Sequence, residues 1–365
     1  MASAPQTPSA QTDFEFMQAA LALAARGIGD TWPNPAVGCV IVNDGAVVGR
    51  GWTQSGGRPH AETEALQRAG PLAKGATAYV SLEPCSHHGK TPPCADALIA
   101  AGVSRVVSAT IDPNPRVLGQ GIAKLRAAGI DVMEGVGKAE ADRLNAGFFK
   151  RIGQNRPLFA LKTATSLDGR IALASGESKW ITGAQARHAV QAIRAKFDAI
   201  LVGSQTVVQD DPELTCRLDG YAGRPKVRIV LDRRLRTAAD RKIVQTAKSI
   251  PTWIYTTQKP SNALTAAGAL VLQFQDTQFI SHVAADLAAK GITRVLIEGG
   301  GQVAASFLKA GLIDEIYWFR SGQVLGHDAK PSAAVLGLDR LSVAPHFKRQ
   351  QTIHFGQDSL DILSQ

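Results

Sequence analysis

Several features of membrane, secreted and disulfide-stabilised proteins are absent from this chain of 365 residues. No uninterrupted apolar run reaches the roughly 20 residues that a membrane-spanning helix needs. The first residues lack the basic start and apolar core of a secretory signal peptide. Only four cysteines occur, which is too few for a disulfide scaffold. We therefore expect a cytoplasmic protein that does not associate with membranes.

The basic residues are not gathered in the way that nucleic-acid binding requires. The formal net charge is +9, but the chain has no long Lys/Arg block and no stripe of alternating basic and aromatic residues. Arg233, Arg234 and Arg236 form the one local concentration. A dispersed positive charge of this kind favours small phosphate-bearing molecules over polynucleotides as partners.

The length predicts two domains, because a single hydrophobic core rarely serves 365 residues. Residues 1–12 are rich in Ala, Ser, Pro, Thr and Gln, and we expect a disordered tail there. Alternating strand and helix patterns continue to about Gly147, and the segment Lys150–Arg156 that follows is polar and expected to be turn-rich. We therefore predict a first domain at 13–150 and a second at 156–365.

In the first domain Asp13 is expected to cap a helix, and Asn43-Asp44-Gly45 is typical of a hairpin turn. The expected strands are Val37–Val42, Ala46–Trp52, Ala76–Leu82, Ser104–Ile111 and Ile130–Glu134, and the expected helices are Phe14–Arg26, Ala61–Ala69, Ala95–Ala101 and Gly121–Ala128. This alternation indicates a sheet that is covered by helices.

The second domain restarts the same alternation and shows no internal repeat of the first. The expected strands are Leu158–Thr165, Ala199–Val202, Val227–Leu231, Thr252–Thr256, Arg294–Glu298 and Glu315–Phe319, and the expected helices are Ala184–Lys196, Ile280–Lys290 and Gln302–Ala310.

One imidazole and two thiols are spaced as ligands of a catalytic zinc ion. His60 and Cys94 each lie at the start of an expected helix, and Cys85 follows an expected strand. Three protein ligands leave one zinc position for water, whose pKa then falls toward neutrality. Glu62 is close enough to His60 to carry the proton of that water.

His87 and His88 offer an alternative, because they could complete a purely structural zinc site. Glycine and proline residues around them indicate a loop at the rim, and a structural site needs no nearby carboxylate. The catalytic interpretation is therefore favoured, with His60, Cys85 and Cys94 as ligands and Glu62 as proton carrier.

A glycine-rich turn, Glu298-Gly299-Gly300-Gly301-Gln302, follows an expected strand and opens an expected helix. Such a turn lets backbone amides approach a phosphate at the positive end of a helix. It lacks the spacing of the dinucleotide fingerprint. Taken alone, it fits a cofactor site and a plain tight turn equally well.

The segment Glu83–Cys94 is similar to the riboflavin-pathway deaminase, because its two cysteines are separated by eight residues where other zinc nucleobase deaminases have two. Pro33-Asn34-Pro35, Pro59-His60-Ala61-Glu62 and Asp112-Pro113-Asn114-Pro115 share this resemblance. It implies one zinc ion per chain, and it implies that Asn34 binds the pyrimidine.

Three further segments resemble the reductase domain of the bifunctional riboflavin-biosynthesis enzymes, namely Lys162–Thr182, Val202–Pro212 and Leu214–Arg217. The implied architecture is a cytidine-deaminase-like three-layer domain followed by a dihydrofolate-reductase-like α/β domain. The resemblance is thin between Arg236 and Ala289. The same resemblance implies that the protein forms a homodimer.

The resemblance also implies binding roles in the second domain. NADPH would contact Ala164, Trp180, Thr206, Asp210, Arg233, Gly300, Gly301, Gln302, Val303, Ala304, Ala305 and Ser306. The ribosyl phosphate substrate would contact Ser178, Arg194, Leu214, Arg217 and Glu298. Considered alone, Arg194 fits a solvated helix face, Trp180 a core position and Asp210 a turn.

The expected function is zinc-dependent hydrolytic deamination of a diaminopyrimidinone ribosylamino phosphate, followed by NADPH-dependent reduction of its ribosyl group to ribityl. A nucleoside or tRNA-type deaminase with an unrelated accessory domain is the alternative, and it predicts the shorter cysteine spacing. A zinc-stabilised binding protein is a second alternative, and it has no use for Glu62. No acid–base residue of the reductase stands out from the sequence.

Overall fold

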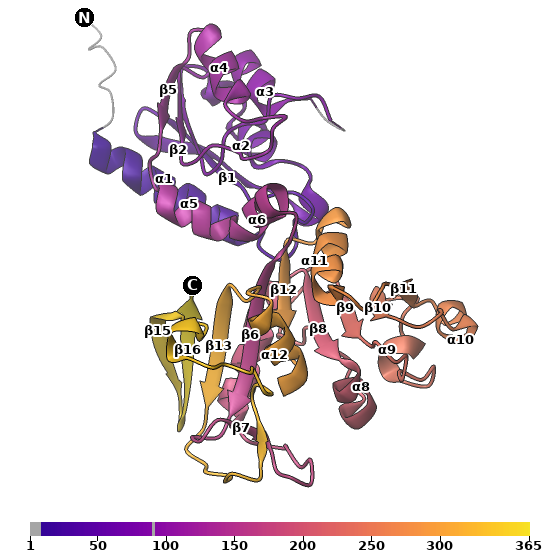
Figure 1. The fold of residues 1–365 in the computed structure, drawn as a ribbon. Helices are drawn as coiled ribbons and strands as arrows, with labels where there is room; N and C mark the ends of the chain where they lie inside the picture. Colours follow the sequence, from indigo (N-terminus) through magenta and orange to yellow (C-terminus); the bar gives the residue numbers. More distant parts are fainter. Residues whose placement is uncertain (1–8, 90–91) are drawn as a thin grey trace, which may run out of the picture. The chain divides into compact units, whose positions relative to one another are not determined.

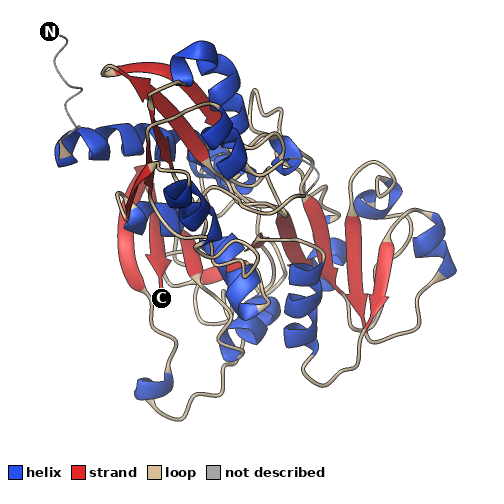
Figure 2. Cartoon of the chain, turned by 90° about the horizontal axis from the view of Figure 1, so that it is seen from above, coloured by secondary structure: helices blue, strands red, loops and turns tan. Residues whose placement is uncertain are grey.

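The computed structural model describes residues 9–89 and 92–365. The chain forms two compact units, and the first ends at Asn155 where the second begins at Arg156 (Figure 1). In both units helices and strands alternate along the chain (Figure 2). Within the part of the chain that is described, no helix combines the length and the apolar character that crossing a membrane demands.

The first unit is built on five strands. The strands are β1 (Gly38–Asn43), β2 (Ala46–Trp52), β3 (Thr77–Val80), β4 (Arg105–Ser108) and β5 (Asp131–Glu134), and the helices are α1 (Ala10–Ala25), α2 (Ala61–Ala69), α3 (Cys94–Ala100), α4 (Gln120–Ala127), α5 (Lys138–Leu144) and α6 (Ala146–Gln154), with short 3₁₀ turns η1 (Ser55–Gly57) and η2 (Gly70–Ala73).

These elements form three layers around a sheet of order β2-β1-β3-β4-β5. On one face, Met17 and Leu21 of α1 and Ala141 of α5 pack with strand residues such as Val40. On the other face, apolar residues of α2, α3 and α4 form a second core with Ile41. Both cores are continuous, so the expected three-layer deaminase-like architecture is confirmed.

Helix α2 lies unusually close to strand β2. A Cβ atom added at Gly51 would come within 2.2 Å of the Ala61 carbonyl oxygen, and one at Gly49 within 2.3 Å of the Ala65 oxygen. Two glycines are therefore required for the helix to approach the strand so closely. This contact fixes the position of the helix that begins directly after His60.

The first helix differs from the prediction at its start. It begins at Ala10, and Ser9 rather than Asp13 caps it by accepting a hydrogen bond from the Thr12 backbone. Residues 10–12 of the expected tail are thus helical, while residues 1–8 lie outside the described residues. Asp13 is buried and accepts hydrogen bonds of 2.7 and 2.8 Å from Arg105.

The end of the first unit also differs from the prediction. The segment Lys150–Arg156 was expected to be turn-rich, but α6 continues to Gln154. Gly147 and Phe148 of α6 are buried, whereas Lys150 and Arg151 are half-buried and Gln154 is exposed, so a helix with one apolar face accommodates this polar sequence.

The second unit contains the remaining elements. The strands are β6 (Leu158–Thr165), β7 (Arg170–Ala172), β8 (Ala199–Gly203), β9 (Val227–Leu231), β10 (Thr252–Thr256), β11 (Leu270–Gln273), β12 (Arg294–Ile297), β13 (Glu315–Arg320), β14 (Lys330–Pro331), β15 (Lys348–Phe355) and β16 (Asp358–Ser364), and the helices are α7 (Ala184–Ala195), α8 (Ser204–Asp210), α9 (Lys242–Gln245), α10 (Asn262–Ala266), α11 (Phe279–Ala289) and α12 (Gly301–Lys309), with one 3₁₀ turn η3 (Leu341–Val343).

Nine of these strands form one sheet in the order β11-β10-β9-β8-β12-β6-β13-β16-β15. All neighbours from β11 to β13 are parallel, and β16 and β15 add an antiparallel edge. Parallel strands present their carboxyl ends at one edge, which is where open α/β sheets bind ligands. The expected reductase-type α/β unit is confirmed.

The six strands expected in this unit are present, but several other elements were not predicted. Helix α8 has the sequence Ser-Gln-Thr-Val-Val-Gln-Asp, whose β-branched and polar residues are poor helix formers. It forms because Val207 is buried in the core with Val202 and Val230. Strand β15 is largely exposed, so it has no alternating apolar pattern to indicate a strand.

Candidate functional site

Three donor atoms converge in the first unit as a metal site would require. The His60 Nδ1 atom lies 3.3 Å from the Cys94 Sγ and 3.7 Å from the Cys85 Sγ. All three donor atoms lie within 4.8 Å of one another. Tetrahedral ligands at ordinary zinc–nitrogen and zinc–sulfur bond lengths are roughly 3.5 Å apart, so the donor set fits a zinc ion.

Secondary structure brings these donors together from distant parts of the sequence. His60 is the residue before α2, and Cys94 is the first residue of α3. Cys85 lies on the loop that leaves β3, and its Sγ accepts a 3.3 Å hydrogen bond from the Cys94 backbone N–H. The N-terminus of α3 therefore directs a backbone N–H at the Cys85 sulfur, which favours the thiolate form of Cys85.

The environment favours a thiolate at Cys85. Hydrogen bonding with the Cys94 side chain, and then with His60 and the Cys94 backbone, lowers the pKa of Cys85 to about 4, although burial opposes this. Hydrogen bonding with Cys85 and burial raise the pKa of Cys94. A bound divalent cation supplies the positive charge that allows both sulfurs to be deprotonated.

Glu62 lies in the first turn of α2 and is 3% exposed. Burial raises its pKa to about 7, and the negative charge of Cys85 acts in the same direction, while His60 opposes it. A carboxyl group with a pKa near neutrality can both accept and release a proton.

Sequence reasoning missed Glu83, which supports the metal loop. Its carboxylate accepts 2.9 Å hydrogen bonds from the backbone N–H groups of Gly119 and Gly121, and a 3.3 Å bond from Asp112. It thereby caps the start of α4 and ties the exit of β3 to the exit of β4. A glutamate directly before Pro84-Cys85 at a strand exit was the signal available in the sequence.

Replacing Glu83 by Gln is expected to destabilise the first unit by about 1–3 kcal/mol, because an amide turns a donor toward backbone N–H groups that need an acceptor. Thermal unfolding measures the loss, and zinc release to a chelator should become faster. Glu134→Gln is the matched control, since Glu134 makes only a surface ion pair with Arg126. Unchanged unfolding and zinc release in Glu83→Gln would contradict this role.

The side chain of Asn34 is held by the backbone of Gly57. Its Nδ2 atom donates a 2.9 Å hydrogen bond to the Gly57 carbonyl oxygen. A Cβ atom at Gly57 would come within 2.3 Å of the same Nδ2 atom, and Gly57 has a φ of +87°, so a glycine is needed there. The predicted pyrimidine contact of Asn34 stays a prediction.

None of the described residues in the loop between the two cysteines joins the group of candidate metal ligands. The metal-type cluster found among the described residues contains His60, Cys85 and Cys94, and not His87 or His88. The Ser86 Oγ and His87 Nδ1 atoms are buried and find no hydrogen-bond partner among the residues that the structure describes. Residues 90 and 91 of this loop lie outside the described residues.

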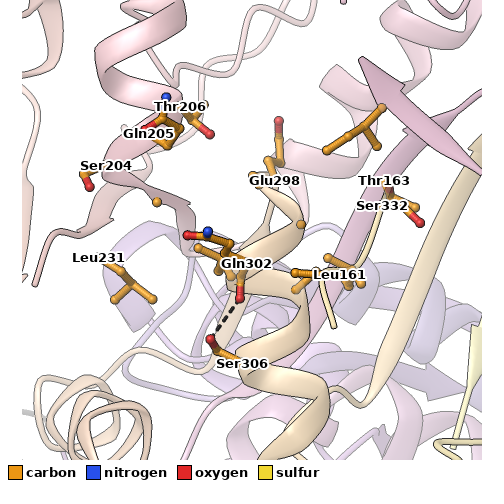
Figure 3. A pocket seen from close by; sticks show the side chains of 18 of the residues that line it. Leu161, Thr163, Ser204, Gln205, Thr206, Leu231, Glu298, Gln302, Ser306 and Ser332 are labelled. Carbon is orange, nitrogen blue, oxygen red and sulfur yellow. Dashed lines mark hydrogen bonds between the residues drawn. The ribbon is translucent and has the colours of Figure 1, made fainter. Parts of the chain in front are cut away.

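A cavity of about 1450 Å³ opens in the second unit at the carboxyl ends of the parallel strands. Figure 3 shows Ser204 and Thr206 of α8, and Gln302 and Ser306 of α12, among the residues that line it. The Gly299-Gly300-Gly301 turn lies in its wall at the start of α12, where backbone N–H groups favour phosphate. The volume of the cavity and the glycine-rich turn both fit a bound dinucleotide.

Most of the residues predicted to contact NADPH line this cavity. They are Ala164, Trp180, Thr206, Asp210, Arg233, Gly300, Gly301, Gln302, Val303, Ala304 and Ser306. Ala305 is buried and is not among the lining residues. Trp180 is 64% exposed, which excludes the core position that its residue type alone suggests. Asp210 ends α8 rather than lying in a turn.

The residues predicted to contact the substrate separate into two groups. Ser178 and Glu298 line the cavity, whereas Arg194, Leu214 and Arg217 do not. Leu214 is 4% exposed and packs in the core, while the Arg217 side chain is 59% exposed and lies 3.7 Å from Glu213. The predicted substrate contacts of Arg194, Leu214 and Arg217 stay predictions.

Arg194 is buried rather than solvated. Its guanidinium donates hydrogen bonds of 2.6 and 2.7 Å to both carboxylate oxygens of Glu298, and one of 2.7 Å to the Thr215 carbonyl. Burial raises the pKa of Glu298, but the Arg194 charge outweighs it, so that pKa lies below the ordinary range. Arg194 therefore fixes an ionised carboxylate at the cavity wall.

Lys162 is the second candidate residue that sequence reasoning missed, although it belongs to a segment used for the resemblance. It lines the cavity from β6, an otherwise largely apolar strand. Burial lowers its pKa, although the nearby Glu298 carboxylate opposes this. A lysine with a lowered pKa beside a fixed carboxylate is suited to proton transfer.

Comparison with known protein families divides the chain as the structure does. Residues 10–110 match a model described as the cytidine and deoxycytidylate deaminase zinc-binding region. Residues 157–360 match a model described as the RibD C-terminal domain. The zinc and NADPH that the sequence predicts are consistent with these two types of domain.

Individual relatives match along almost the whole chain. Riboflavin biosynthesis protein RibD of Escherichia coli is 46% identical over 95% of this chain and 97% of its own length, and that of Aquifex aeolicus is 41% identical over 95% and 97%. These relatives leave no room for an unrelated accessory domain.

Solved structures of similar proteins also match along almost the whole chain. One form of RibD from Acinetobacter baumannii is 40% identical with a TM-score of 0.91, covering 98% of this chain and 99% of that one. A Thermotoga maritima deaminase/reductase is 35% identical with a TM-score of 0.86, covering 97% and 99%. The chain therefore belongs to the RibD family of riboflavin biosynthesis proteins and joins a zinc-dependent deaminase unit to an NADPH-dependent reductase unit.

Proposed function

We propose that the two units act in turn on one phosphorylated pyrimidine. The T. maritima relative is described as a diaminohydroxyphosphoribosylaminopyrimidine deaminase and 5-amino-6-(5-phosphoribosylamino)uracil reductase. The deaminase of this chain would remove ammonia from that diaminopyrimidine, and the reductase would convert the ribosyl group of the product into ribityl. The observation that carries the proposal is the buried Glu62 beside the His60, Cys85 and Cys94 donor atoms.

For deamination, the first unit needs a held metal and a proton carrier. His60, Cys85 and Cys94 would hold zinc, which when bound lowers the pKa of water and so supplies a nucleophile. Glu62 would take a proton from that water and deliver it to the leaving amine, for which its raised pKa is suited. Asn34 would hydrogen-bond to the pyrimidine.

For reduction, the second unit needs a bound hydride donor and a source of one proton. Bound NADPH would supply a hydride to the sugar carbon that bears the nitrogen, and the bond from that carbon to the ring oxygen would break. The ring oxygen must then gain a proton, which we assign to Lys162. The negative charge of Glu298 would stabilise the protonated form of Lys162, and Arg194 would hold Glu298 in place.

The substrate phosphate and the cofactor need the remaining contacts. Ser178 and Arg217 would bind the ribosyl phosphate, with Leu214 shaping that segment. Thr206, Asp210, Arg233 and the predicted α12 residues would bind NADPH. Arg194 would act through Glu298, because both edges of its guanidinium are already engaged.

The proposal is tested by supplying the purified protein with the diaminopyrimidinone ribosylamino phosphate, with and without NADPH. Ammonia should be released in both cases, and NADPH should be oxidised only after deamination. Cytidine and deoxycytidylate serve as control substrates and should not be deaminated. Deamination of these controls with no turnover of the ribosylamino phosphate would refute the proposed substrate.

A further inference from the structure

An unusually exposed tryptophan forms part of the reductase cavity wall. Trp180 is 64% exposed and lies on the segment between β7 and α7. At that exposure, packing against the core contributes little to holding the indole ring in one orientation. If its ring is to form a binding surface, some other group must fix it.

Arg187 makes two contacts with this segment. Its guanidinium carbon lies 4.3 Å from the centre of the Trp180 ring, within the range of cation–π attraction. Its Nη1 atom also donates a 2.6 Å hydrogen bond to the Thr182 carbonyl oxygen. The same side chain therefore holds both the indole and the backbone two residues further on.

The base from which Arg187 extends is itself fixed. It lies in the first turn of α7, where the Gly183 N–H donates a 2.6 Å hydrogen bond to Asp358 of β16. Ala186 and Val190, on either side of Arg187 in the sequence, are buried. The guanidinium thus links the segment that carries Trp180 to an anchored helix.

Helix stability does not explain an arginine at this position. The amino-terminal turn of a helix carries partial positive charge, so a cation there is unfavourable. Arg187 also lines the cavity together with Trp180 and Ser178. Because Arg187 is unfavourable for the stability of the helix, its presence there is consistent with a role in the cavity wall.

We infer that Arg187 is a positioning residue of the reductase, which holds the Trp180 indole in the orientation that receives NADPH. This inference rests on the proposed function, because it takes Trp180 to be a cofactor contact. The sequence resemblance assigns no role to Arg187. A direct contact between Arg187 and the substrate phosphate is the competing explanation, and the experiment separates the two.

The test is a double-substitution cycle on the full-length protein, in which NADPH is varied at saturating deaminated substrate and the deaminated substrate is varied at saturating NADPH. Arg187→Ala should raise the KM for NADPH about 3- to 30-fold and change kcat less than about twofold, since a cation–π pair and one hydrogen bond are lost. Trp180→Ala should also raise the KM for NADPH. In the Trp180→Ala background, the further substitution Arg187→Ala should raise that KM almost no further. Arg187→Lys should restore part of the affinity.

Tryptophan fluorescence gives a readout that needs neither cofactor nor turnover. Subtracting the Trp180→Phe spectrum isolates the emission of Trp180, which should shift in Arg187→Ala. Arg26→Ala is the matched control, because Arg26 stacks 4.1 Å from the Trp52 ring in the other unit. It should leave both the NADPH KM and the Trp180 emission unchanged.

Three results would overturn the inference. They are an unchanged NADPH KM in Arg187→Ala, an unchanged Trp180 emission, and a rise in the substrate KM that persists in the Trp180→Ala background. The last would instead place Arg187 on the substrate. Failure of the proposed function is distinguishable, because the unsubstituted protein would then not oxidise NADPH at all.

Discussion

Replacing Glu62 by Gln should reduce deamination by about 10²- to 10⁴-fold while zinc stays bound. The amide keeps the size and buried position of the side chain but cannot carry a proton. His60, Cys85 and Cys94 are unaltered, so the donor set is intact. Reduction of substrate that has already been deaminated should proceed at the normal rate.

The measurements are ammonia release, zinc content and NADPH oxidation. Glu64→Gln is the matched control, since it makes the same change two residues further along α2 at a side chain that pairs with Arg68. Deamination should be normal in that variant. Retained deamination in Glu62→Gln, with zinc still present, would rule out Glu62 as the proton carrier.

Replacing Lys162 by Met should reduce NADPH-dependent reduction by a similar factor, about 10²- to 10⁴-fold, and leave deamination intact. Methionine fills a similar volume but cannot donate a proton. The unsubstituted enzyme should also lose reductase activity as the pH rises through the pKa of Lys162, because the donor must be protonated. Burial lowers that pKa, so the loss should begin below the ordinary range of a lysine.

Single-turnover reduction, measured across pH, tests this role, and NADPH binding is measured separately to show that the cavity is intact. Lys196→Met is the matched control, because Lys196 follows the end of α7 and is exposed. Reduction in Lys162→Met at the normal rate and with the normal pH profile would show that the proton comes from another group.

The metal site could be predicted from the sequence because its chemistry depends on residue types that have few other uses in this pattern. His60, Cys85 and Cys94 lie near helix and strand ends that glycine, proline and apolar periodicity also mark. Their convergence within 4.8 Å needed only the expected elements to form.

The roles of Arg194 and Lys162 could not be predicted in the same way. Whether an arginine faces solvent, a phosphate or a buried carboxylate depends on which strand lies beside its helix, and Glu298 is 104 residues away. Lys162 is a single polar residue in an apolar strand, and only the cavity shows which side it lines. Asp13 was misjudged for the same reason, because its partner Arg105 comes from β4.

The close contact between α2 and β2 has a consequence for altering the specificity of the deaminase. His60 and Glu62 belong to the same end of a helix that Gly49 and Gly51 hold against the sheet. Any shift of that helix would displace His60, the candidate metal ligand, and Glu62, the proposed proton carrier, together. Variants aimed at other amine substrates should therefore leave this helix unchanged and diversify residues 86–89, which belong neither to the helix nor to the metal-type cluster.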